Sequence, residues 1–98
     1  MTIVKKIKLE LIEDYLKNIV GLCSIIRVSQ EELKYVNSKL RKNENEFASG
    51  GISENLYKGN KTNLENEKRK LNEKINLNIE KTLKTLENIK NVLNEIEI

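Results

Sequence analysis

A large apolar residue returns at every seventh position through the first half of the chain. With this residue as position a of a heptad, the series is Ile12, Ile19, Ile26, Leu33, Leu40 and Phe47. The d positions, three residues later, are Tyr15, Leu22, Ser29, Val36 and Asn43. Such a repeat lies along one face of an α-helix, and the sequence contains no proline to interrupt it. The pattern therefore predicts one long amphipathic helix over residues 4–47.

Further apolar residues widen this stripe on both flanks, with Leu16 and Cys23 on one side and Leu11 and Ile25 on the other. A stripe this broad is typical of a helix that packs against more than one neighbour, as in a helical bundle.

A capping-box pattern at Ser29-Gln30-Glu31-Glu32 offers an alternative, in which the first helix breaks near Val28. The heptad continues from Ile26 to Leu33 without a slip. This continuity favours a single helix.

Residues 48–62 break the periodicity and are expected to connect two helices. Gly50-Gly51 should end the first helix, with a glycine in the left-handed conformation. Ser53 is expected to cap a short turn through Tyr57, which Gly59 ends. Thr62-Asn63-Leu64-Glu65 then resembles a capping box that opens the second helix.

The second helix is expected over residues 63–96. Its apolar side is expected to consist of Leu64, Leu71, Ile75, Ile79, Thr82, Leu86, Ile89, Leu93 and Ile96. From Ile75 the spacing alternates between four and three residues, the rhythm of a coiled coil. The sequence therefore predicts an all-α fold, a single domain over residues 1–98 in which two long amphipathic helices form an antiparallel hairpin.

A hairpin of two helices has no enclosed centre, and a chain of 98 residues buries only a modest part of its surface. We therefore expect it to complete a four-helix bundle or coiled coil with a helical protein, in a homo-oligomer or a hetero-oligomer. The residues expected to bind this partner are Ile12, Tyr15, Ile19, Leu22, Ile26, Leu33, Val36, Leu40, Phe47, Tyr57, Gly59, Leu71, Ile75, Ile79, Leu86, Ile89 and Leu93.

The charge distribution disfavours nucleic acid as the partner. The 18 basic and 15 acidic residues give a net charge of only +3. The basic clusters Lys5-Lys6-Ile7-Lys8 and Lys68-Arg69-Lys70 are each followed by acidic residues, which is typical of a solvated helix face and not of a phosphate-binding stripe.

Residues suited to catalysis or metal binding are scarce. The chain has no histidine and one cysteine, Cys23, which lies among apolar residues and is expected to be a small buried hydrophobe. Gly50-Gly51 lacks the lysine and hydroxyl residue of a phosphate-binding loop. We therefore expect no catalytic site, no cofactor, no metal, no small-molecule substrate and no enzymatic activity.

The sequence is expected to belong to a cytoplasmic protein. Glu10, Glu13 and Asp14 interrupt what would be the apolar region of a signal peptide, and the apolar stretch 19–28 is too short to span a membrane. Frequent Lys, Asn and Ile indicate an AT-rich genome.

Tyr57-Lys58-Gly59, between the two expected helices, resembles the Trp-x-Gly motif of the small helical-hairpin proteins of type VII secretion. Asn60-Lys61-Thr62-Asn63-Leu64 is similar to the start of the second helix in the small partners of LXG toxins. Tyrosine replaces tryptophan here, and the C-terminal Tyr-x-x-x-Asp/Glu export signal is absent. The resemblance implies an adaptor that pairs with a like protein or a secreted toxin's helical region and is exported without a cleaved signal peptide.

The leading functional hypothesis is therefore a non-catalytic helical partner or adaptor protein that binds through its apolar seam. The alternative is a structural coiled coil that associates with itself. A nucleic-acid-binding helical module is the least favoured of the three.

Overall fold

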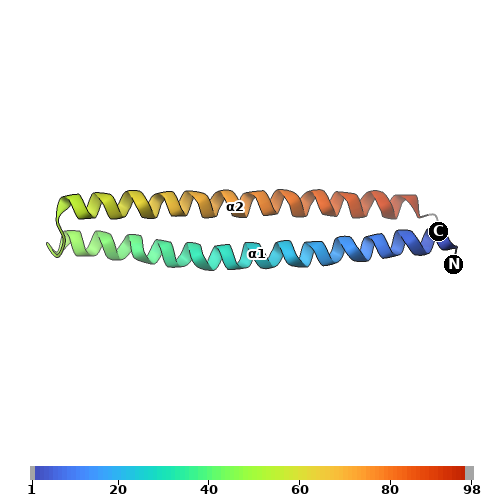
Figure 1. Ribbon diagram of the computed structural model, residues 1–98, viewed down its shortest axis with the longest axis horizontal. Helices are drawn as coiled ribbons and strands as arrows, with labels where there is room; N and C mark the ends of the chain where they lie inside the picture. The colour runs from blue at the N-terminus through green and yellow to red at the C-terminus, as the bar shows by residue number, and fades with distance from the viewer. Residues whose placement is uncertain (1, 97–98) are drawn as a thin grey trace. The chain divides into compact units, whose positions relative to one another are not determined.

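The computed structural model describes residues 2–96, which form two long antiparallel helices (Figure 1). Helix α1 spans Ile3–Ala48 and helix α2 spans Glu54–Glu95. The predicted all-α hairpin of two long helices is confirmed.

The chain forms two compact units, which are described separately. Unit 2 is the continuous segment Arg27–Ile75, and unit 1 combines the chain up to Ile26 with the chain from Asn76 onward. In each unit a stretch of α1 packs against an antiparallel stretch of α2.

Helix α1 is continuous through Ser29, so the alternative of a break near Val28 is wrong. The observed helix begins one residue before the predicted range and ends one residue after it. The Ser29 hydroxyl does not cap a new helix: it is buried, and its Oγ has no hydrogen-bond partner among the described residues.

The end of α1 is a Schellman motif built on Gly50. This glycine has a φ of 77°, in the left-handed region that other residues rarely adopt. The Gly50 N–H donates to the Phe47 carbonyl at 3.0 Å, and the Gly51 N–H donates to the Glu46 carbonyl at 2.8 Å. These two bonds satisfy carbonyls that the helix end would otherwise leave unpaired. The predicted left-handed glycine is confirmed.

Helix α2 begins much earlier than predicted. Ser53 is its N-cap, because the Leu56 N–H donates to the Ser53 Oγ at 3.2 Å. The helix then runs through Gly59 and Thr62 without interruption, so the predicted turn ending at Gly59 and the predicted helix start at residue 63 are both wrong. A glycine inside a helix costs only about 1 kcal/mol relative to alanine, which the packing of α2 against α1 offsets.

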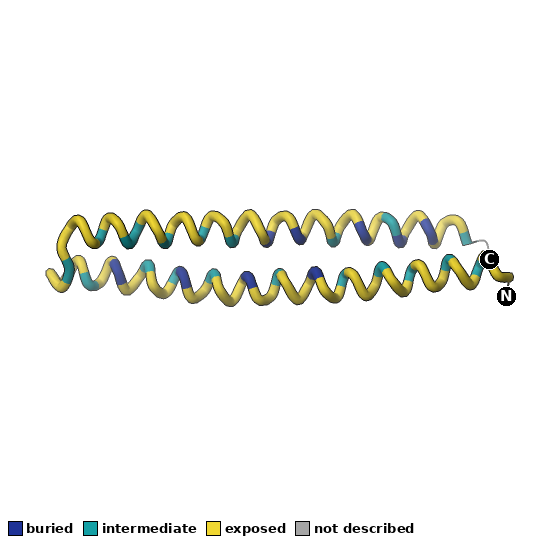
Figure 2. The backbone as a smooth tube through the Cα atoms, in the orientation of Figure 1, coloured by how far each residue is buried: buried dark blue, intermediate teal, exposed yellow. Residues whose placement is uncertain are grey.

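The seam between the helices in unit 2 follows the α1 heptad. Val36, Ser29 and Asn43 of α1 and Ile75 of α2 are buried. Figure 2 shows the buried positions of both helices in dark blue. Half-buried seam residues surround them: Leu33, Leu40, Tyr57, Leu64 and Leu71.

In unit 1 the α1 side of the seam also follows the heptad, with Leu22 buried. Its half-buried members are Ile12, Tyr15, Ile19 and Ile26. The α2 side of this seam consists of the buried residues Asn78, Thr85, Ile89 and Val92.

The predicted phase of α2 is therefore wrong by one residue at three positions. Ile79, Leu86 and Leu93 were expected in the seam, but 41%, 48% and 53% of their surfaces are exposed. The seam positions belong to the preceding residues, Asn78, Thr85 and Val92. One residue turns a helix by about 100°, so the apolar row lies beside the seam and not in it.

Candidate functional site

The expected partner-binding residues occupy two different kinds of surface. Twelve face the other helix in their own unit, buried or half-buried: Ile12, Tyr15, Ile19, Leu22, Ile26, Leu33, Val36, Leu40, Tyr57, Leu71, Ile75 and Ile89. The exposed ones are Phe47, Gly59, Ile79, Leu86 and Leu93. Binding of a partner by any of them stays a prediction, and the exposed ones are the most accessible while the hairpin remains closed.

Two polar contacts fix the register of the helices in unit 1. The Lys8 ammonium lies 3.6 Å from the Glu95 carboxylate. The Asn18 Nδ2 donates to the Thr85 Oγ1 at 3.4 Å. The two contacts are ten residues apart on α1 and ten residues apart on α2. The antiparallel helices therefore stay in step: a residue n positions after Lys8 in α1 lies at the same height as the residue n positions before Glu95 in α2.

The two sides of the unit 1 seam differ in chemistry. On one side Val4, Lys5 and Lys8 of α1 and Glu95 and Ile96 of α2 line a shallow depression. The heptad repeats of Val4 and Glu95 bring Leu11, Asn18 and Ile25 of α1 to the same side as Lys81 and Asn88 of α2. This side therefore carries an apolar row on α1, interrupted by Asn18, and a polar row on α2.

The opposite side of unit 1 is apolar on both helices. We define the unit 1 apolar face as Leu9, Leu16, Val20 and Cys23 of α1 with Ile79, Leu83, Leu86 and Leu93 of α2. All eight residues are exposed, with Val20 at 70% and Leu83 at 61% among the most accessible. In register, Leu9, Leu16 and Cys23 come nearly level with Leu93, Leu86 and Ile79, one heptad apart on each helix.

The sequence pattern did not predict that these eight residues form one surface. The sequence pattern puts Leu16 and Cys23 on a flank of the α1 stripe, and Ile79, Leu86 and Leu93 in the main apolar row of the second helix. The available signal was the seven-residue spacing of Leu9, Leu16 and Cys23 on α1 and of Ile79, Leu86 and Leu93 on α2. Cys23 was expected to be buried, and this is wrong: the thiol is free and its residue is exposed, because the position lies beside the seam.

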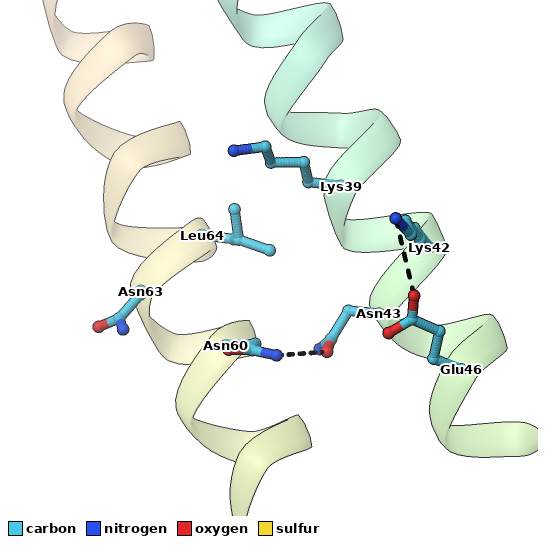
Figure 3. A pocket seen from close by; sticks show the side chains of 7 residues that line it. All are labelled: Lys39, Lys42, Asn43, Glu46, Asn60, Asn63 and Leu64. Carbon is cyan, nitrogen blue, oxygen red and sulfur yellow. Dashed lines mark hydrogen bonds and ion pairs between the residues drawn. The ribbon is translucent and has the colours of Figure 1, made fainter. Parts of the chain in front are cut away.

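A polar cluster lies next to the turn in unit 2. The Asn43 Nδ2 donates to the Tyr57 carbonyl at 3.1 Å. The Asn60 Nδ2 donates to the Asn43 Oδ1 at 3.1 Å (Figure 3). The Tyr57 hydroxyl donates to the Glu44 carboxylate at 2.6 Å, and the Lys61 ammonium lies 3.7 Å from the same oxygen. These contacts tie the first two turns of α2 to the end of α1.

The ionisable groups of this cluster influence one another. The hydrogen bond to Glu44 raises the pKa of the Tyr57 phenol, burial adds to the rise, and Lys61 opposes it. The pKa of the Lys61 ammonium is also raised, chiefly by its side-chain hydrogen bond with Tyr57 and then by the negative charges nearby. The neutral phenol and the charged ammonium are therefore the favoured forms.

Tyr57-Lys58-Gly59 lies within α2 and not in the connection where it was expected. Gly59 has an ordinary helical backbone, and a Cβ built on it would meet no atom within 4 Å. The backbone conformation at this position therefore does not require glycine. Tyr57 does have defined packing, because its ring stacks on that of Phe47.

The described residues show neither a metal-binding cluster nor a membrane-spanning helix. Among residues 2–96 no group of three or more Cys, Asp or Glu side chains is arranged to hold a metal ion. Neither described helix is long and apolar enough to cross a membrane.

In comparisons with known proteins, no protein family model matches the chain, and no curated protein or solved structure is significantly similar to it.

Proposed function

We propose that this protein is a non-catalytic binding partner for another helical protein surface, and that the exposed apolar residues beside its seam make the contact. The observation that carries the proposal is the unit 1 apolar face, in which both helices expose large aliphatic side chains at heptad spacing. Scattered apolar residues are normal on a protein surface, but a contiguous patch of this kind marks an interaction site.

The chemistry of the described surface supports a binding role over a catalytic one. Two depressions on it are lined largely by lysine, asparagine and glutamate side chains. The two raised pKa values belong to Tyr57 and Lys61, whose contacts join the two helices of unit 2. We propose that these groups are structural.

The native mass of the protein isolated from the cells that make it tests this proposal. The full chain, isolated from those cells under mild conditions, should have a native mass larger than that of one chain. A mass equal to the single chain, under conditions that preserve known weak complexes, would contradict the proposal. Loss of the extra mass at high salt alone would point to charged partners, and so against an apolar contact.

We also propose, more narrowly, that the partner is a helical segment of a secreted toxin or a like hairpin. The two-helix layout and the resemblance of Tyr57-Lys58-Gly59 to Trp-x-Gly support this proposal, while the ordinary backbone of Gly59 gives it no support. Tyr57→Ala should weaken binding to a partner identified by mass. Tyr35→Ala is the control, because Tyr35 is 62% exposed and lies away from the turn. Equal effects of the two substitutions would leave the broader proposal intact and remove this one.

A further inference from the structure

We propose that the unit 1 apolar face binds the same face of a second copy of this chain, with α1 of one copy lying against α2 of the other. This inference rests on the proposed function and specifies both the surface and the occupant. A helical dimer of this kind would enclose the face within a four-helix core.

The size of the face fits a dimer contact. Its seven large aliphatic side chains expose between 41% and 70% of their surfaces. Together they leave on the order of 600 Å² accessible per copy, against about 800 Å² per partner in a typical stable interface. The polar residues at the edges of the face supply the remainder.

The chemistry of the face requires an uncharged partner surface at its centre. The row next to the seam is Leu9, Leu16 and Cys23 on α1 and Ile79, Leu86 and Leu93 on α2, without a charged or polar member. A charged surface would lose its hydration against this row without gaining a partner. A second copy offers a row of the same chemistry and spacing.

The outer edges of the face are complementary to each other. The outer row contains Glu13 and Val20 on α1 and Leu83 and Lys90 on α2. By the register of unit 1, Glu13 comes level with Lys90 and Val20 with Leu83. A two-fold axis parallel to the helices brings α1 against α2 of the second copy at the same level. Each Glu13 then meets a Lys90, and each Val20 meets a Leu83.

The other two-fold arrangement matches the edges less well. An axis perpendicular to the helices would place α1 against α1, with Glu13 near Val20 and Lys90 near Leu83. Every charge would then face an aliphatic side chain. Neither Glu13 nor Lys90 has an ion-pair partner within residues 2–96, so both are available for the first arrangement.

Sedimentation equilibrium of the purified full chain at micromolar concentrations tests the surface and the occupant. The wild type should dimerise, and Leu86→Lys should weaken the dimer by at least about a hundredfold, because it places a charge on the apolar face of both copies. Leu77→Lys is the matched control, since Leu77 lies on the same helix, outside the face, with a similar exposure of 50% against 48%. It should leave the dissociation constant within about twofold.

A charge exchange tests the arrangement. Glu13→Lys and Lys90→Glu should each weaken the dimer by about fivefold through two like-charge contacts, and the double variant should restore it. Circular dichroism of each variant establishes that the hairpin is folded.

A monomeric wild type would overturn the inference, while a larger complex isolated from cells would still support the proposed function. A dimer that Leu86→Lys does not weaken would overturn the choice of face. Failure of the double variant to recover would overturn the parallel-axis arrangement.

Discussion

The aromatic rings of Phe47 and Tyr57 stack across the hairpin turn, with centroids 4.3 Å apart and planes at 14°. Phe47 lies in the last turn of α1 and Tyr57 in the first turn of α2, and the Tyr57 hydroxyl continues outward to Glu44. One side chain thus joins the helices through an apolar contact and a charge-assisted hydrogen bond.

Alkaline pH should weaken the turn through Tyr57. Its folded pKa lies above the unfolded value of 10.0, so its contribution to stability is fully present below that pH and is lost as the pH rises through the folded value. The pKa of Lys61 is also raised, from 10.5, so the stability that the charged Lys61 contributes is likewise lost at alkaline pH. We expect the wild type to be more stable than Tyr57→Phe at pH 8 and to lose this advantage above pH 10. Thermal melts across this range measure the difference. Tyr35→Phe serves as control, and a constant gap between wild type and Tyr57→Phe would contradict the expectation.

The glycines should respond to alanine with opposite signs. Gly50→Ala should destabilise the hairpin by about 1–2 kcal/mol, because alanine pays a steric cost at a φ of 77°. Gly59→Ala and Gly21→Ala should each stabilise it by about 0.5–1 kcal/mol, since a Cβ at either site meets nothing within 4 Å of a helical backbone. Urea titrations followed by circular dichroism give the three values. Destabilisation by Gly59→Ala would contradict this expectation and would mean that the folded structure needs glycine there.

Two buried polar residues of the unit 2 seam should also differ in sign. The Ser29 Oγ is buried and has no hydrogen-bond partner among the described residues, so Ser29→Ala should stabilise the hairpin by about 1 kcal/mol. Asn43→Ala should destabilise it by about 1–3 kcal/mol, because the Tyr57 carbonyl and the Asn60 amide lose their partner. The same urea titrations measure both effects. Equal losses of stability would mean that the Ser29 hydroxyl has a partner in solution.

The position of the unit 1 seam can be tested with a single charge. Leu22→Asp should cost at least about 3 kcal/mol, because Leu22 is only 8% exposed against α2. Ile79→Asp should cost less than about 1 kcal/mol in dilute solution, because 41% of Ile79 faces solvent. Far-ultraviolet circular dichroism melts at low protein concentration separate the two. A larger loss for Ile79→Asp would place the seam on the row that the sequence pattern suggested.

The predicted α1 and the observed α1 agree closely because several independent signals coincide. Its heptad keeps one phase from Ile12 to Phe47, no proline intervenes, and Gly50 supplies the stop. Polar members of the repeat, Ser29 and Asn43, did not disturb this phase because apolar neighbours surround them.

The prediction failed in α2 because hydrophobicity and burial follow different rows there. The seam accepts Asn78 and Thr85, while the aliphatic side chains of Ile79 and Leu86 stand one residue later. A prediction based on apolar character therefore selects the row of Ile79 and Leu86 as the buried one. The start of α2 was misplaced for a similar local reason: Ser53 and Thr62 both resemble caps, and the choice between them depends on tertiary contacts of Tyr57 and Asn60 that the sequence does not display.

The tight glycine turn has a consequence for how the hairpin folds. The contacts beside it join residues close in sequence, since Tyr57 is 13 residues from Glu44, whereas 87 residues separate Lys8 from Glu95. Chain closure costs more entropy as the loop lengthens, and local contacts form faster. We therefore expect the helices to pair first around Gly50 and then zip toward the chain ends. A substitution in the turn should slow folding, while one near Lys8 should mainly speed unfolding.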